Sequence, residues 1–151
     1  MALDSGAILK KLVTIAQATG QFRNVNGYEI RSTPANGLTL SLIAGPLTTI
    51  DSSGLNRASM RFQVDGQIWL SMHTDPPESI DPRTMDAAGR FLTDLCGQFT
   101  LGGLVRCVDV HGMAGERLSA TPGYVEMDGK LYRAATLVIP LLINDVFTLT
   151  A

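Results

Sequence analysis

Charge is scarce in this chain. Only 17% of its 151 residues are charged, against roughly 25% in an average soluble domain, and the net charge is −2. The only basic pair is Lys10-Lys11. Tight, sequence-independent binding to nucleic acid needs many phosphate contacts from Lys and Arg, so the composition argues against that role. A charge-poor surface suits contact between subunits, although a small neutral domain would explain the composition equally well.

Cysteine is also rare, and its spacing excludes the common thiol motifs. Cys96 and Cys107 are too far apart for a CxxC site. Cys96 falls on the apolar face of an expected helix and Cys107 inside an expected strand. We therefore expect both to be small buried core residues in a reducing compartment. A disulfide between them is kept as an alternative.

Long hydrophobic runs are absent. The longest, Leu137 to Ile143, contains Pro140 and is far too short to span a bilayer. Near the N-terminus, Asp4 precedes the first apolar stretch and Lys10-Lys11 interrupts it, which is unlike a signal peptide. We expect a soluble, cytosolic protein with no membrane contact.

Catalytic motifs are missing as well. The chain has no G-x-S-x-G, no GxGxxG and no P-loop, and neither cysteine has the setting of a reactive thiolate. The only histidines are His73 and His111, with Asp75, Asp109 and Glu116 nearby in sequence. They could form a metal site only if two loops met in space. We expect no enzyme, cofactor or metal, and keep a small-molecule- or metal-binding domain as an alternative.

The first expected helix runs from about Ser5 to Thr19. Asp4 or Ser5 can cap its start, and Gly20 can end it. Its apolar face is wider than one sheet needs to cover. Either this helix is buried deep in its own domain, or it offers a second contact surface.

The second helix has the clearest start signal in the chain. Asp81 is expected to cap it, Pro82 to take the first helical position and Ile80 to pack on Met85. Gly97 is expected to stop it. Its buried stripe is expected to consist of Met85, Ala88, Leu92, Leu95 and Cys96.

Two segments share the pattern of a tight hairpin: Phe62 to Trp69 (FQVDGQIW) and Val125 to Tyr132 (VEMDGKLY). Asp-Gly tolerates the positive φ angles of a primed turn, so each segment predicts two antiparallel strands. Around the first turn, Met60, Phe62 and Val64 are expected to share one face. On the return strand, Ile68 and Leu70 are expected on one face and Trp69 on the other.

Further strands are expected at 38–43, 104–110 and 146–150. Gly45-Pro46 should break the first of them, and Pro140 should sit at an edge or bulge because it cannot donate to a ladder. Long polar loops are expected at 44–58, including the flexible SSGLNRA stretch at 52–58, and at 111–122. The whole chain, 1–151, is therefore predicted to be a single α+β domain: a mixed, mostly antiparallel sheet with two β-hairpins, packed by two amphipathic helices.

The order of these elements, with the strand LVRCVDVHG (104–112) and the closing segment GYVEMDGKLYRAATLVIPLLIND (123–145), resembles the tail terminator proteins of long-tailed bacteriophages. The resemblance implies a virion protein that assembles into a ring of six subunits. The ring would cap the tail tube, end its polymerisation and offer a face for head attachment, with DNA passing through its lumen without specific binding. It would also close sheet edges between subunits. The implied partners are further copies, the tube protein and head-tail connector proteins.

No catalytic, cofactor-binding or metal-binding residue is carried over from this family. The loop at 111–122 is a hypothetical contact with the tube or neck. A head-tail connector or stopper, or a tube subunit, stays an alternative, because such proteins share small α+β architectures and ring assembly.

Overall fold

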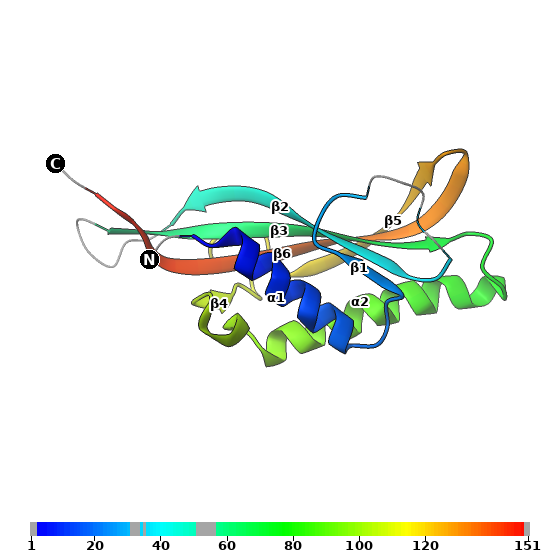
Figure 1. The fold of residues 1–151 in the computed structure, drawn as a ribbon, viewed down its shortest axis with the longest axis horizontal. Coiled ribbons are helices and arrows are strands. Elements are labelled where there is room, and N and C mark those ends of the chain that lie inside the picture. Colours follow the sequence, from blue (N-terminus) through cyan, green and yellow to red (C-terminus); the bar gives the residue numbers. More distant parts are fainter. Residues whose placement is uncertain (1–2, 31–33, 35, 51–56, 150–151) are drawn as a thin grey trace.

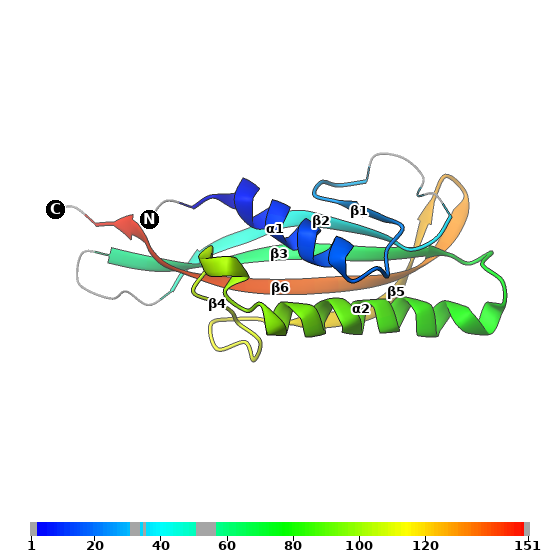
Figure 2. The same ribbon diagram turned by 60° about the horizontal axis from the view of Figure 1, so that its bottom comes forward.

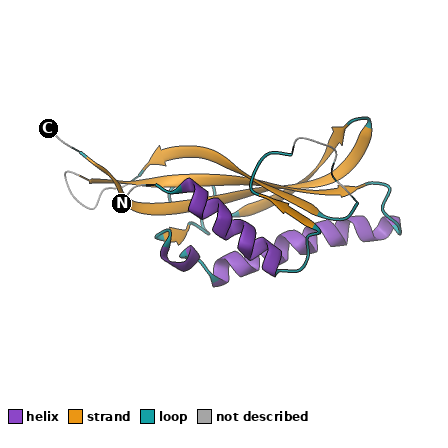
Figure 3. Ribbon diagram, viewed as in Figure 1, coloured by secondary structure: helices purple, strands orange, loops and turns teal. Residues whose placement is uncertain are grey.

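The computed structural model describes residues 3–30, 34, 36–50 and 57–149. It confirms the predicted α+β class: one six-stranded sheet with two helices against it (Figure 1, Figure 3). The elements are α1 (Ser5–Ala18), β1 (Asn24–Asn26), β2 (Thr39–Thr49), β3 (Arg57–Ser71), η1 (Pro77–Ser79), α2 (Ile80–Gly97), η2 (Leu101–Gly103), β4 (Cys107–Val108), β5 (Ser119–Met127) and β6 (Lys130–Thr148).

The two longest strands, β3 and β6, pair at the centre of the sheet and run the length of the molecule (Figure 1). The strand order is β1-β2-β3-β6-β4, and β5 also pairs with β6. Only β1 and β2 are parallel; all other described pairs are antiparallel. Along the free side of β6, β5 occupies the first half and β4 the second, so these two short partners lie at opposite ends of one strand.

Both helices cover the same face of the sheet (Figure 2). Helix α1 contacts β1 and β2, whereas α2 contacts β3, β5 and β6. The period-two pattern predicted for β3 is confirmed, because its even-numbered apolar side chains from Met60 to Leu70 belong to the core under the helices, whereas Trp69 lies on the other face. Burying this layer is the main favourable contribution to folding. Its largest fully buried side chains are Phe62, Phe91, Leu12, Leu40, Leu42, Met60, Ile68, Leu70, Leu95, Leu101, Leu137 and Ile139.

Of the two Asp-Gly pairs, only the second forms a turn. Asp128 (φ 52°) and Gly129 (φ 76°) close the β5–β6 hairpin as predicted. The hairpin predicted at Asp65-Gly66 is wrong: β3 continues straight through these residues. Gly66 is instead needed for close packing, because a Cβ there would lie 3.1 Å from Leu137. The sheet still has two hairpins, since β2 and β3 form the other one.

Gly45-Pro46 does not break β2, which continues to Thr49 instead of giving way to the loop expected at 44–58. The β2–β3 register shifts between Ala44 and Leu47, so the pair sits in a bulge, where a missing N–H is tolerated. Of the predicted SSGLNRA loop, residues 52–56 lie outside the described residues, and Arg57 already belongs to β3.

The prediction that Pro140 sits at an edge or bulge is wrong. This proline lies inside β6, a central strand, opposite Gln63 of β3. Its carbonyl accepts a hydrogen bond from the Asp109 N–H at 2.8 Å. In a strand the N–H and C=O of one residue point the same way. The side of Pro140 that lacks an N–H therefore faces the gap between the end of β4 at Val108 and the start of β5 at Ser119, and no ladder bond to β3 is lost. The separate strand expected at 146–150 is also wrong, because β6 continues to Thr148; residue 150 is not described.

The start of α1 is as predicted: Asp4 accepts a hydrogen bond from the Ala7 N–H at 3.0 Å. The start of α2 is not. Ser79 takes the cap position, and Asp81 instead accepts from Arg133 of β6 at 2.9 Å, which fastens the first turn of α2 to the sheet.

The stripe that α2 buries also differs from the prediction. Leu95 and Ala88 are buried, but Met85 and Leu92 only partly, and the remaining core contacts come from Ile80, Thr84, Ala87 and Phe91.

The two cysteines are free thiols. Cys96 is exposed and Cys107 is half-buried, so the expectation that both are buried core residues is wrong. The strand expected at 104–110 shrinks to β4, because residues 104–106 form a turn and bends between η2 and the strand.

Candidate functional site

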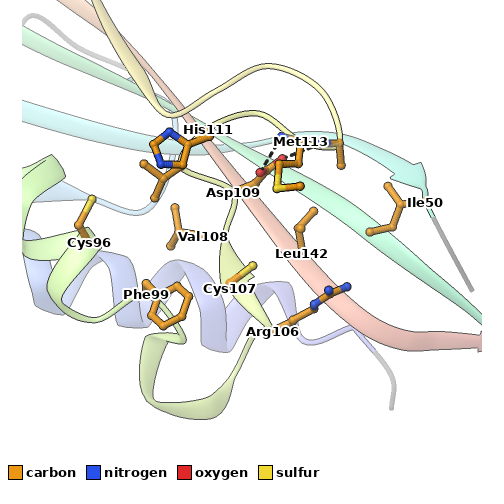
Figure 4. A pocket seen from close by; sticks show the side chains of 12 residues that line it. Ile50, Cys96, Phe99, Arg106, Cys107, Val108, Asp109, His111, Met113 and Leu142 are labelled. Atoms are coloured by element: carbon orange, nitrogen blue, oxygen red, sulfur yellow. Dashed lines mark hydrogen bonds between the residues drawn. The ribbon is translucent and has the colours of Figure 1, made fainter. Parts of the chain in front are cut away.

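A pocket of about 730 Å³ lies beside β4, between the end of α2 and the segment that follows β4 (Figure 4). Its walls come from sequence-distant segments that the sheet brings together. Leu142 of β6 and Ile50 after β2 lie on one side, and Cys96 and Phe99 on another. We call it the β4 pocket; it is lined by Ile50, Cys96, Phe99, Arg106, Cys107, Val108, Asp109, Val110, His111, Met113, Ala114 and Leu142.

One wall of the pocket is a loop, residues 109–118, that we call the tip loop. The loop predicted at 111–122 is therefore shorter, because β5 already begins at Ser119. Asp109 organises it from within. Its buried carboxylate accepts hydrogen bonds from the N–H groups of Met113 and Ala114, both at 2.9 Å. This is a side-chain-to-backbone bond of the kind that builds turns.

Arg61 holds the same loop from the sheet side. Its guanidinium is almost fully buried, donating from Nη2 to the Glu116 carbonyl at 3.0 Å and from Nη1 to Gln63 Oε1 at 2.9 Å. Gln63 in turn donates to Asp65 at 2.7 Å. Gly115 makes this possible, because a Cβ there would lie 2.8 Å from Arg61 Nε.

The outcome is an ordered loop with an apolar side chain at its apex. Met113 is 91% exposed, more than any other large hydrophobic residue in the described chain. Phe99, on the opposite wall of the β4 pocket, is 50% exposed. A methionine displayed on a fixed turn beside an apolar pocket suits the capture of apolar side chains from another protein.

The ionisable side chains of the β4 pocket suit binding better than catalysis. Burial raises the pKa of the Cys107 thiol above its ordinary value of 9.0; Arg106 lowers it and Asp109 raises it by smaller amounts. Cys107 is therefore protonated at neutral pH, whereas a nucleophilic cysteine needs a lowered pKa. Asp109, the buried carboxylate of the site, is committed to the two backbone N–H groups of the tip loop.

The structure does not bring the candidate metal ligands of the two loops together. His73 and Asp75 follow β3, at the end where Ser71 pairs with Tyr132, whereas Asp109 and His111 follow β4, which pairs with Leu142. Ten residues of β6 separate the two ends, about 33 Å at strand geometry. Within the described ranges, no three His, Cys, Asp or Glu side chains are placed to share a metal ion.

Sequence reasoning singled out the tip loop but missed Arg61, Ile50 and Phe99. A signal for Arg61 was available: it is the one cation between the apolar residues Met60 and Phe62, in a strand that alternates toward the core. Asp109, with Gly112 three residues on, likewise has the form of a side-chain-capped turn. Ile50 and Phe99 carry no local signal, because only the tertiary fold makes them neighbours.

No helix in the described part of the chain is long and apolar enough to cross a bilayer. Comparison with known proteins returns no family model that matches the chain and no curated protein that matches it significantly.

Proposed function

We propose that this protein is a structural subunit of a bacteriophage tail, a terminator that forms a ring on the end of the tail tube. The observation that carries the proposal is the tip loop. Its order is built by buried polar contacts from Asp109 and Arg61, yet its apex presents the apolar side chain of Met113 to solvent. Such a loop is preorganised for docking on another protein, because little conformational entropy remains to be lost on binding.

A ring subunit needs two different surfaces, since each copy contacts one neighbour with each. A second candidate surface lies on α1, the helix for which the sequence left open either deep burial or a second contact surface. There a shallow groove of about 430 Å³ is lined by the half-buried Leu9 and Val13, by two glycines and by the polar side chains of the same helix face, namely Gly6, Leu9, Lys10, Val13, Thr14, Gln17 and Gly27. The β4 pocket and this groove each combine apolar walls with a few polar side chains and are built by different elements. Two such different surfaces are what head-to-tail association requires.

The free edges of the sheet favour association through side chains over strand pairing. Among the described strands, β1, β4, β5 and the part of β2 beyond Ser41 each have a single neighbour, and the last two are the longest of these edges. Both carry a proline, Pro122 in β5 and Pro46 in the β2 bulge. A proline removes a donor and blunts an edge against pairing with another strand. Ring closure would then rest mainly on side-chain contacts, which differs from the closure of sheet edges between subunits that the resemblance implies.

The functional test is the length of tail tubes assembled from the cognate tube protein and viewed by negative-stain electron microscopy. Added wild-type protein should bind tube ends and stop growth, giving short tubes with a ring at one end. Met113→Asp should lose this activity while unfolding at the same urea concentration, and Met113→Leu should keep it. Growth unaffected by the wild-type protein would refute the terminator role.

Other outcomes of the tube-length assay distinguish a terminator that docks elsewhere from a tube subunit. Capping by both the wild-type protein and Met113→Asp would keep the function but move the docking site away from the tip loop. Long cylinders formed by this protein alone would assign it as a tube subunit. Once capping is established, the same images place the protein in the virion, between the tube and the head-joining proteins.

A further inference from the structure

A second, smaller pocket opens on the face of the sheet opposite the helices. It has a volume of about 160 Å³ and involves neither the tip loop nor the β4 pocket. The odd-numbered side chains of β2 and β3, which turn away from the core, form its floor. It is lined by Glu29, Ile30, Ser41, Ile43, Gln67, Trp69, Val125 and Met127.

Two lining residues carry buried polar atoms with no hydrogen-bond partner. Ser41 is 2% exposed and Trp69 is 6% exposed, and among the residues that the structure describes neither Ser41 Oγ nor Trp69 Nε1 has a hydrogen-bond partner. Thr39, directly opposite Trp69 in the β2–β3 register, has an equally buried and unpartnered Oγ1. Buried polar groups almost always have a partner, and a group without one points to a water or ligand. Three such groups on one patch of sheet are therefore a strong indication.

The unpartnered atoms define the chemistry of the missing occupant. Indole N–H only donates, so it needs an acceptor, whereas the serine hydroxyl both donates and accepts. A hydroxyl group satisfies both at once. A cation would face the indole N–H, and an anion would face the carboxylate of Glu29, so a neutral molecule fits best. Ile43, Val125 and Met127 supply apolar walls against which C–H groups can pack.

The volume limits the size of the occupant. At about 30 Å³ per water molecule, the pocket holds roughly five waters, or one molecule of about six heavy atoms. We propose that this pocket is a binding site for neutral hydroxyl groups, contributed by ordered water or by a small polyol, which accept from Trp69 Nε1 and bond to Ser41 Oγ. The site is independent of the ring assembly proposed above.

Trp69 is the only tryptophan in the chain, so its indole N–H gives a single, assignable NMR signal. The experiment titrates glycerol into the ¹⁵N-labelled full-length protein and records this signal, together with its cross-relaxation to water. A saturable shift that removes the water cross-peak identifies a polyol site. A water cross-peak that glycerol does not change identifies ordered water. Both outcomes support a hydroxyl site and distinguish its two sources.

The variants test the part played by Ser41. Ser41→Ala keeps the cavity but removes one hydrogen-bond partner of the bound hydroxyl. If the occupant is glycerol, its binding should weaken about fivefold to tenfold, as expected for one lost hydrogen bond. If the occupant is water, its exchange should become faster by the same factor. Ser119→Ala, on β5 and outside the pocket lining, should change neither. An indole N–H that contacts neither water nor glycerol in the wild-type protein would overturn the proposal, whatever the variants show.

Discussion

The guanidinium of Arg61 and the main-chain carbonyl of Glu116, 55 positions apart in sequence, are joined by a hydrogen bond of 3.0 Å. This contact ties the tip loop to the central strand β3. With the two bonds that Asp109 makes inside the loop, it explains how a segment rich in glycine can hold Met113 in one place. The surface proposed for docking thus depends on two buried polar side chains behind it.

Arg61→Met should destabilise the protein by about 1–3 kcal/mol, because the Glu116 carbonyl and Gln63 Oε1 would lose their buried donor. Urea unfolding followed by Trp69 fluorescence measures this free energy. Arg83→Met, an exposed cation on α2, is the matched control and should change stability by less than about 0.5 kcal/mol. Equal effects from the two substitutions would show that the Arg61 contacts are not stabilising.

Asp109→Ala should loosen the tip loop while leaving the sheet intact. The N–H groups of Met113 and Ala114 lose their shared acceptor, so their hydrogen exchange should accelerate at least tenfold, as for about 1.4 kcal/mol of lost local stability. Asp109→Asn keeps one acceptor oxygen and should lie between Ala and wild type. Unchanged exchange at 113 and 114 in Asp109→Ala would mean that the glycine turns alone fix the loop.

The two Asp-Gly pairs should respond differently to alanine. Gly66→Ala places a Cβ 3.1 Å from Leu137, and the crowding should cost about 1–3 kcal/mol. Gly129→Ala meets no neighbour within 4 Å but must hold a φ of +76°, which should cost about 1–2 kcal/mol. Chemical denaturation of each variant gives both values.

A second substitution in each variant distinguishes steric crowding at position 66 from the cost of a positive φ at position 129. Shortening the neighbour by Leu137→Val should recover part of the loss in Gly66→Ala and none of it in Gly129→Ala, as measured by a double-mutant cycle. Gly129→Asn should be less harmful than Gly129→Ala, because asparagine tolerates the left-handed region. Rescue of Gly129→Ala by Leu137→Val would contradict this assignment.

The two thiols should differ in reactivity and in pH dependence. Thiolate is the reacting form, and the raised pKa of Cys107 leaves less of it at pH 8 than an ordinary cysteine has. Iodoacetamide should therefore modify the exposed Cys96 faster, with mass spectrometry of Cys96→Ser and Cys107→Ser reading each thiol alone. The difference in labelling rate should narrow at more alkaline pH, because the raised pKa of Cys107 delays the formation of its thiolate. Faster labelling of Cys107 at pH 8 would be inconsistent with this environment.

Local signals predicted much of the fold. The caps of α1, the period-two pattern of β3 and the Asp128-Gly129 turn are all decided by near neighbours in sequence. Asp65-Gly66 shows where such signals fail. The apolar residues at even positions keep the same phase on both sides of this pair, from Met60 to Leu70, and that continuity favours one long strand over two short ones. Close packing against Leu137 of β6 then explains why position 66 is a glycine.

The candidate site was less predictable than the fold. The tip loop was recognisable as a loop, but its order depends on Arg61, which lies 55 positions from Glu116. The β4 pocket joins side chains from β6, the end of α2 and the residue after β2, whose proximity only the assembled sheet creates. The exposed position of Cys96 has the same origin, because the core contact of α2 shifted to Phe91 and Ala87.

Assembly as a closed ring can be tested by measuring the mass of the purified protein by light scattering over a wide concentration range, with negative-stain images of the same samples. We predict a discrete oligomer with closed rings in the images, which Met113→Asp or substitutions in the α1 groove at Leu9 and Val13 reduce to smaller species. A monomer at every concentration, which forms no ring even on added tail tubes, would contradict the account.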